Sequence, residues 1–356
     1  MKLNDISSLR IINQQIDQSK FNSVKLLVGH MGAMQAQDFL MAKYAIGLRV
    51  NNADDSIVSE AINNGDIIRT HLLRPTWHFV SSDNIYWMLK LTAPRIKKIL
   101  NFRNKQLGLD TALYKKSNKI IEKALTGNNN LTREELISIL KKNKIDVDEN
   151  RASHYLMEAE IIELVCSGTI KNGKQTYALL DERITRKDNL SREEALAKLA
   201  ELYFTSHGPA TDKDFYWWSG LTIKEVRIAI ELISKKFNVE KINEENYIFK
   251  NPSKFMKNSG VYLLPAYDEF VISYKDRTAL LHPDNHESVI SMNGIFKPTI
   301  LVNGKVAGIW KRVTKNNVIK VEINLFGKVN SLNKNLIEKA VSKYSNFLGK
   351  EANIVM

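Results

Sequence analysis

The chain has a single cysteine and only seven prolines in 356 residues, and it lacks any long hydrophobic run. Because Cys166 has no second cysteine to pair with, no internal disulfide forms, and a metal site would have to use histidines and carboxylates. No apolar stretch approaches the ~18 residues that a transmembrane helix requires. The N-terminal residues also lack the apolar core of a signal peptide. We therefore expect a cytoplasmic protein that contacts no membrane.

Acidic residues are the other shortage, since 39 Asp and Glu face 52 Lys and Arg, a formal net charge of +13. Hydrophobic residues make up 44% and charged residues 26%, as in ordinary globular chains. This composition excludes a disordered tail, a collagen-like repeat and a disulfide scaffold. The excess of positive charge indicates either a polyanionic partner or a lysine-rich composition without such a partner.

The positive charge is concentrated in residues 88–116, where eight basic residues face only Asp110. We expect helix on either side of Pro94, with a buried face drawn from Ile96, Ile99, Leu100 and Phe102. The basic residues form either a solvated helix face or a surface that contacts phosphates. The candidates for such contacts are Lys97, Lys98 and Arg103.

One pattern of helices followed by a strand pair occurs three times along the chain. The middle copy has helices near 117–125, 131–141 and 150–163, and a capping-box start at Thr132. An Asn172-Gly173 turn then joins strands near 164–168 and 175–180. Three helices and a hairpin, in this order, are typical of a winged helix.

The other copies follow the same order. The first has helices near 23–33, 38–49 and 54–63 and a strand pair within 67–80; the third has helices near 195–206, 212–218 and 222–235 and strands near 237–240 and 247–250. From about residue 252 the chain is rich in strands, including a predicted strand at 270–274, and a helix at 333–348 follows. We predict an α+β fold with winged-helix modules at 1–116, 117–190 and 191–251 and a β-barrel-like domain at 252–356.

The predicted recognition helices carry little positive charge. In the first two modules acidic residues dominate, which would repel phosphate, and only the third helix is basic on balance, through Lys224 and Arg227 among others. A transcription factor reads the major groove with such helices. Three modules with one basic helix favour instead a scaffold that places one special site against a nucleic acid.

The first candidate site is Gln35-Ala36-Gln37, followed by Asp38. In an extended segment, residues i and i+2 point to the same side, so Gln35 and Gln37 can converge on one point while Asp38 caps the next helix. The alternative is that both glutamines are exposed loop residues.

A second candidate lies on the predicted strand at 71–80, where Arg74, Thr76 and His78 would share a polar face that holds phosphate or orders a water. Two further segments favour structural roles. His207 lies in a turn, and Asp268-Glu269 offers adjacent carboxylates that could instead serve as acid or base. The sequence contains no P-loop, dinucleotide fingerprint, metal-binding His/Cys set or Ser/His/Asp arrangement, so we expect no metal and no cofactor.

Taken in order, these motifs resemble the azinomycin-resistance family of winged-helix DNA glycosylases over nearly the whole chain. The segments that carry the resemblance are Gln35-Ala36-Gln37, the strand at 71–80, His207-Gly208-Pro209-Ala210-Thr211, Trp218-Ser219-Gly220-Leu221, Leu264-Pro265 with Tyr267-Asp268-Glu269, and residues 304–310.

The resemblance implies three tandem winged helices, a C-terminal β-barrel and a monofunctional glycosylase for N-alkylated bases. In some members it also implies unhooking of interstrand crosslinks. The family's Gln-x-Gln motif falls on Gln35 and Gln37, which would be the catalytic residues; a sister branch has Asp at the second position. The expected partner is double-stranded DNA with alkylated bases, bound by a monomer. The alternatives are a non-catalytic winged-helix DNA-binding protein and a protein-interaction scaffold.

Overall fold

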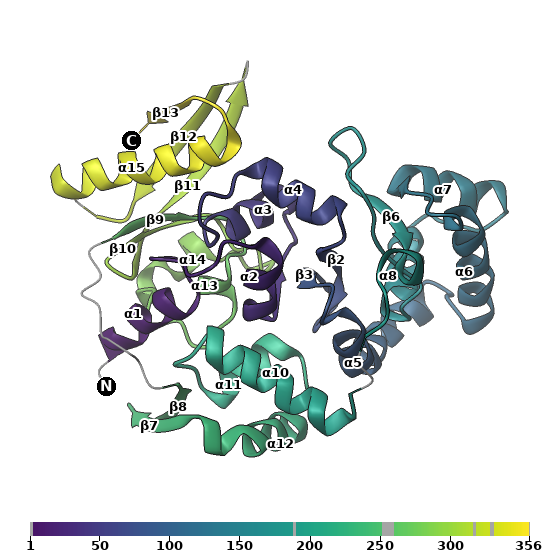
Figure 1. Ribbon diagram of the computed structural model, residues 1–356, viewed down its shortest axis with the longest axis horizontal. Helices are drawn as coiled ribbons and strands as arrows, with labels where there is room; N and C mark the ends of the chain where they lie inside the picture. The colour runs from purple at the N-terminus through teal and green to yellow at the C-terminus, as the bar shows by residue number, and fades with distance from the viewer. Residues whose placement is uncertain (1–2, 188–189, 251–259, 316–317, 328–330, 356) are drawn as a thin grey trace.

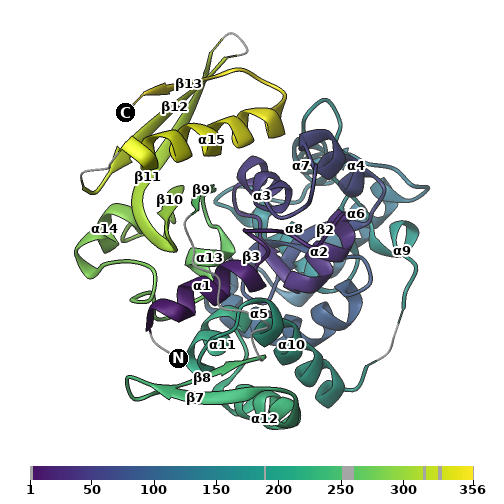
Figure 2. The ribbon, with the colours of Figure 1, turned by 60° about the vertical axis from the view of Figure 1, so that its left-hand side comes forward.

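The computed structural model describes residues 3–187, 190–250, 260–315, 318–327 and 331–355. It has a mixed α+β fold, as predicted. Three groups of helices, each followed by a small sheet, precede a larger C-terminal sheet (Figures 1 and 2).

The first group holds the Gln35 segment. Helix α1 (Leu3–Asn13) precedes α2 (Val24–Met31), β1 (Ala33–Gln35), α3 (Phe39–Gly47), α4 (Asp55–Asn63), β2 (Ile67–Leu72) and β3 (Thr76–Ser81). The strands form a sheet in the order β1-β3-β2. The predicted helices and strand pair are confirmed, but Arg74 lies in the turn between β2 and β3, so it does not share a strand with Thr76 and His78. The reason is that Leu73 adopts a positive φ of 60°, which ends β2.

Helix α5 (Ile85–Gln106) carries the basic segment and runs without a break through Pro94. The expected buried face is partly wrong. Ile96 is buried and Leu100 packs beside it, but Ile99 and Phe102 are 45% and 73% exposed. Ile96 and Leu100 lie on the side of the helix that packs against Ile161, whereas Ile99 and Phe102 lie outside this contact.

The second group is α6 (Thr111–Leu125), β4 (Leu131–Thr132), α7 (Arg133–Lys142), α8 (Arg151–Ile161), β5 (Val165–Ser167), β6 (Thr176–Leu179) and α9 (Leu180–Arg183). The capping box at Thr132 is present as predicted. Asn172 and Gly173 both have positive φ, 52° and 74°, as a two-residue hairpin turn requires. This hairpin leads into β6, which is the central strand of the β4-β6-β5 sheet.

The third group contains α10 (Arg192–Ser206), α11 (Asp212–Ser219), α12 (Ile223–Ile233), the 3₁₀ turn η1 (Ser234–Lys236), β7 (Asn238–Ile242) and β8 (Glu245–Phe249). Ala210 forms an additional bridge with Ile248 in β8. Thr211 caps α11, and Gly220 ends it with a φ of 67°. The predicted element order of this group is confirmed.

The C-terminal part is a five-stranded sheet in the order β13-β12-β11-β10-β9. Its elements are β9 (Val261–Leu264), α13 (Glu269–Ile272), η2 (Pro283–Asn285), α14 (His286–Val289), β10 (Thr299–Val302), β11 (Lys305–Lys315), β12 (Val318–Leu325), α15 (Ser331–Leu348) and β13 (Ala352–Val355). Within the described residues the sheet is curled but open, since β9 and β13 do not pair with each other. Helix α15 lies along it (Figure 1).

The strand predicted at 270–274 is wrong, because this segment begins with the short helix α13. Asp268 accepts a hydrogen bond from the Phe270 N–H at its N-terminus, and all four helical residues are buried. A short apolar run that is buried on every side gives no periodicity to separate strand from helix. The correction matters because α13 holds the Gln35 segment.

One large core connects the groups. A single cluster of buried side chains includes Ile68 of the first group, Tyr203 and Trp218 of the third, and Leu264 and Phe270 of the C-terminal part. The segments around Gln35 lie where these parts meet.

Candidate active site

The Gln35-Ala36-Gln37 segment leaves the sheet at the end of β1. Gln35 pairs with His78 across the sheet, and the Ala36 N–H donates to the Trp77 carbonyl over 2.7 Å. Asp38 then caps α3 by accepting from the Met41 N–H. The predicted cap at Asp38 is present, but the strand ends at Gln35 and Gln37 lies in a bend, so the strand does not continue to the second glutamine. The two glutamines differ, since Gln35 is buried at 5% exposure and Gln37 is exposed.

Gln35 belongs to a row of buried polar side chains across the sheet. Thr70, His78 and Gln35 lie opposite one another on β2, β3 and β1, so their side chains share one face. Within the described residues, Thr70 Oγ1, His78 Nε2 and Gln35 Oε1 make no hydrogen bond. Buried polar atoms usually have a partner, so this row is suited to a small polar guest such as an ordered water.

His78 is an uncharged member of this row. Burial, and then the charge of Arg74, lower the pKa of His78 to about 3, so the ring is neutral at neutral pH. Its Nδ1 lies 2.9 Å from the Thr76 carbonyl and therefore carries the proton, which leaves Nε2 as an acceptor. At 1% exposure, His78 is placed to order a water through Nε2 rather than to contact phosphate.

Glu269 holds the backbone of Gln35 from the opposite side. Its Oε1 accepts from the Gln35 N–H over 2.5 Å, and its Oε2 accepts from Trp218 Nε1 over 3.2 Å and from the Ser273 hydroxyl. His207 Nε2 lies 3.4 Å from Oε2. Burial alone would raise the pKa of Glu269, but the neighbouring His207 ring and the hydrogen bonds from Ser273 and the Gln35 N–H lower it to about 2. Glu269 therefore stays negatively charged at neutral pH and is held in place by its hydrogen bonds.

Asp268, next to Glu269, is also structural. It forms a bidentate ion pair with Arg49 at 2.7 and 2.8 Å, and neither side chain is exposed. Arg49 also donates to the carbonyls of Gln14 and Ala45. Both carboxylates are thus occupied in holding the first group against the C-terminal part, which agrees with the structural interpretation of this pair.

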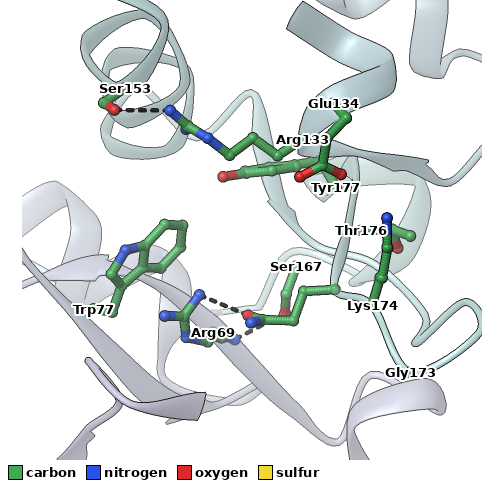
Figure 3. A pocket seen from close by; sticks show the side chains of 11 residues that line it. Arg69, Trp77, Arg133, Glu134, Ser153, Ser167, Gly173, Lys174, Thr176 and Tyr177 are labelled. Carbon is green, nitrogen blue, oxygen red and sulfur yellow. Dashed lines mark hydrogen bonds between the residues drawn. The ribbon is translucent and has the colours of Figure 1, made fainter. Parts of the chain in front are cut away.

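A cavity of about 540 Å³ lies between β2, β3 and the hairpin of the second group, with Arg69, Trp77 and Gln175 among its lining residues (Figure 3). Arg69 on β2 lies in its wall, with its guanidinium 3.9 Å from the centre of the Trp77 ring. Arg69 Nε donates to the Ala36 carbonyl over 3.0 Å and Nη1 donates to Gln175 Oε1 over 2.6 Å. Burial lowers the pKa of Arg69 to about 10, which leaves it charged at neutral pH. Arg69 therefore ties the residue between the two glutamines to the hairpin of the second group.

The structure does not bring the remaining predicted contact residues together. Lys97 and Lys98 are exposed on α5, where Lys97 forms an ion pair with Glu158 at 3.0 Å, and Arg103 lies farther along the helix. Lys224 and Arg227 are exposed on α12. Thr76 is partly buried at the start of β3, and Arg74 reaches the Trp217 ring.

Arg69 was missed as a functional candidate, because it precedes the predicted strand at 71–80 and nothing in its local sequence indicates that it would reach Ala36. Glu269 was considered either structural or an acid or base, and only the fold shows that its partner is the Gln35 backbone. Among the described residues no group of three or more His, Cys, Asp or Glu side chains is arranged to hold a metal ion. No helix in the described ranges is long and apolar enough to cross a membrane.

Comparison with known proteins identifies the family of this chain. The family model described as "DNA glycosylase AlkZ-like" matches residues 28–347. A curated protein of Streptomyces sahachiroi, named "Interstrand DNA cross-link repair glycosylase", is 21% identical over 315 residues, which cover 82% of this chain and 83% of that protein. The solved structure of Streptomyces sahachiroi DNA glycosylase AlkZ matches 100% of both chains with a TM-score of 0.83 at 17% identity, which shows a shared fold. The resemblance recognised in the ordered motifs is confirmed, and the chain belongs to the AlkZ-like DNA glycosylase family.

Proposed function

We propose that this protein is a monofunctional DNA glycosylase that hydrolyses the N-glycosidic bond of N-alkylated, cationic purines. The observation that supports this most directly is the Gln35-Ala36-Gln37 segment. It is held by Glu269 at the Gln35 N–H and by Arg69 at the Ala36 carbonyl, and its second glutamine is exposed to a substrate.

The proposed chemistry needs no general acid. An N7- or N3-alkylated purine is already positively charged, so the electron pair of the C1′–N bond neutralises the base as it leaves. Positive charge then develops on the sugar, and the amide oxygens of Gln35 and Gln37 stabilise it. A water attacks C1′, loses its proton to solvent and leaves an abasic site. An amide cannot serve as a general base, so the glutamines orient the water and do not deprotonate it.

We also propose that the three helical groups are winged-helix modules, bounded at 116, 190 and 251, that act together on duplex DNA as a monomer in the cytoplasm. Support comes from the observed order of helices followed by antiparallel strands in each group. The relative from Streptomyces is named for interstrand crosslink repair. We extend this to the present chain as a proposed second substrate, in which hydrolysis at one alkylated purine unhooks the two strands.

A lesion panel tests the proposal. The wild type should release base from duplexes that contain N7-methylguanine, N3-methyladenine or an N7-linked interstrand crosslink, and the double variant Gln35→Ala/Gln37→Ala should release none. Gln106→Ala is the matched control, because Gln106 is an exposed glutamine at the end of α5. If the wild type binds duplex and releases no base from any of these substrates, the protein is a non-catalytic DNA-binding protein. Salt-independent or absent duplex binding would favour a protein-interaction scaffold instead.

A further inference from the structure

Three positively charged side chains surround the indole ring of Trp217 on α11. The charged groups of Lys275, Arg74 and Arg277 lie 5.3, 5.4 and 5.5 Å from the ring centre. Arg74 comes from the turn between β2 and β3, whereas Lys275 and Arg277 follow α13. We call these four residues the Trp217 cluster. Parts of the chain that are far apart in sequence form it, so it exists only in the folded protein.

The ring at the centre of the cluster is fixed in place. Trp217 Nε1 donates to the Ile272 carbonyl over 2.8 Å, and the ring is half-buried. Cations within about 6 Å of an indole face are attracted to it. The ring therefore helps to hold three like charges close together, although it cannot neutralise them.

The two arginines of the cluster have donors without acceptors. Arg277 Nε donates to the Val271 carbonyl over 2.9 Å and Nη1 to the Lys275 carbonyl over 3.3 Å, but within the described residues the buried Nη2 has no partner. The buried Nε of Arg74 also has none. A buried guanidinium N–H without an acceptor is costly, so each of these donors is suited to an anionic guest.

The carboxylates near the cluster already accept hydrogen bonds from other groups. Asp276 accepts from the Thr278 N–H and hydroxyl at 2.9 and 3.0 Å. Asp214 Oδ1 accepts from the Lys275 N–H at 2.8 Å, while its Oδ2 accepts from Thr211 and faces Arg10. Burial, together with the charge of Arg74, lowers the pKa of Arg277 to about 10, while Asp214 and Asp276 oppose the change. Arg277 therefore remains charged at neutral pH, and the charge of Arg74 acts against it.

The cluster is connected directly to the proposed active site. Helix α13 is only four residues long. Its first residue, Glu269, accepts from the Gln35 N–H, and its last residue, Ile272, accepts from Trp217. An anion held by the cluster is therefore placed by the same short helix that places Gln35.

We propose that Arg74, Lys275 and Arg277 bind a phosphodiester of the DNA strand next to the damaged nucleotide. Paired arginines suit a tetrahedral oxyanion because each guanidinium offers several donors. This inference rests on the proposed function for its substrate, duplex DNA. It adds the residues that would place the damaged strand relative to Gln35 and Gln37.

The first test measures how duplex binding depends on salt. The loss of a whole phosphate contact reduces the slope of log K against log[salt] by about 0.9, and the loss of one of its three cations should reduce the slope by part of that amount. We expect this loss in Lys275→Gln and in Arg277→Gln, and no change in Lys142→Gln, an exposed lysine at the end of α7. Lys275 is also exposed, so its replacement should leave the fold intact even if Arg277→Gln does not fold. An unchanged slope in a folded Lys275→Gln would overturn the proposal.

The second test locates the phosphate. Single methylphosphonates, which are uncharged, are placed in turn along the damaged strand. Wild-type binding should weaken at one linkage within about two nucleotides of the lesion, and this weakening should be smaller in Lys275→Gln, since one of the three cations that hold this linkage is already lost. Independent, additive effects of the variant and the neutral linkage would contradict the proposal.

A third arm separates DNA from free phosphate, and binding from catalysis. Inorganic phosphate at constant ionic strength should compete weakly with duplex. If phosphate binds tightly while no linkage in DNA is sensitive, the cluster serves a small anion and the proposal fails. If the linkage effect is present but the wild type releases no base from any lesion, the glycosylase proposal fails and the phosphate contact stands.

Discussion

Two tryptophans, Trp77 and Trp217, each carry arginine guanidinium groups beside the proposed active site, but the arginines differ in their partners. At Trp77, Arg69 donates to the Ala36 carbonyl and to Gln175 Oε1. At Trp217, Arg74 and Arg277 each retain a buried N–H without an acceptor. Within the described residues Arg69 has no such unpaired buried donor, whereas Arg277 keeps one beside its two hydrogen bonds to backbone carbonyls.

This difference in hydrogen bonding indicates different roles for the arginines at the two tryptophans, one structural and one in binding a ligand. A charged donor with its partners in place fixes the fold, and Arg69 fixes the carbonyl between the two glutamines. A buried charged donor without an acceptor lowers the stability of the fold, and it obtains an acceptor only when a ligand binds. The Trp77 side therefore holds the proposed catalytic segment, and the Trp217 side has free donors for a ligand.

Replacing one arginine on each side tests this difference. Arg69→Met should lower the free energy of unfolding by about 4 kcal/mol, because two hydrogen bonds from a charged group are lost at about 1.5–3 kcal/mol each. Arg74→Met should change it by no more than about 1 kcal/mol, since an unpaired buried donor is removed. Urea unfolding of both variants measures these values, and equal losses would remove the distinction between the two sides.

Glu269, which connects the Trp217 side to Gln35, should make the free energy of unfolding depend on pH in the acidic range. Its pKa is lowered from 4.5 to about 2 in the folded protein, so its contribution is present above pH 4.5 and is lost as the pH falls towards 2. A shift of this size corresponds to about 3 kcal/mol. The free energy of unfolding of the wild type should fall by this amount between pH 4.5 and 2, in addition to the effects of other carboxyls.

In Glu269→Gln the free energy of unfolding should lack this fall of about 3 kcal/mol. The control Glu134→Gln should retain it, because Glu134 is an exposed residue at the cavity that Arg69 and Trp77 line. Urea titrations over this pH range give the comparison. A fall of the same size in Glu269→Gln and in the wild type would show that Glu269 carries no depressed pKa.

Gln175→Ala should leave Arg69 at Trp77 with an unpaired buried donor, as Arg74 and Arg277 have at Trp217. Arg69 then loses the acceptor of Nη1, and a buried unpaired donor costs about 1–2 kcal/mol. Added sulfate should restore part of this stability, and more than it adds to the wild type, because an anion can reach the freed donor. Gln106→Ala, the exposed control, should stay within about 0.5 kcal/mol of the wild type. A stability of Gln175→Ala equal to that of the control would mean that the Arg69–Gln175 bond contributes nothing.

Local signals in the sequence predicted a large part of this arrangement. The capping box at Thr132, the Asn172-Gly173 turn and the cap at Asp38 each depend on neighbouring residues, and all are present. The extended Gln35 segment follows from the same kind of reasoning. Its local geometry could therefore be stated before the fold was known.

Contacts between distant segments could not be predicted in this way. Nothing near Glu269 in the sequence indicates that it accepts from the Gln35 backbone, and nothing near Arg74 or Arg277 indicates that they meet at Trp217. The short apolar run at 270–274 was assigned to a strand because burial on all sides removes the periodicity that separates strand from helix. Without α13 in its place, neither the support of Gln35 nor the Trp217 cluster can be deduced.

The most direct measurement is the single-turnover release of base from a duplex with one N7-methylguanine, with duplex binding measured in parallel. The wild type should release the base, and Gln37→Ala should release it at least ~100-fold more slowly while its binding stays nearly unchanged, as expected for a group that stabilises charge only in the transition state. No release by the wild type, or an equal loss of release and binding in Gln37→Ala, would contradict a catalytic role for the two glutamines.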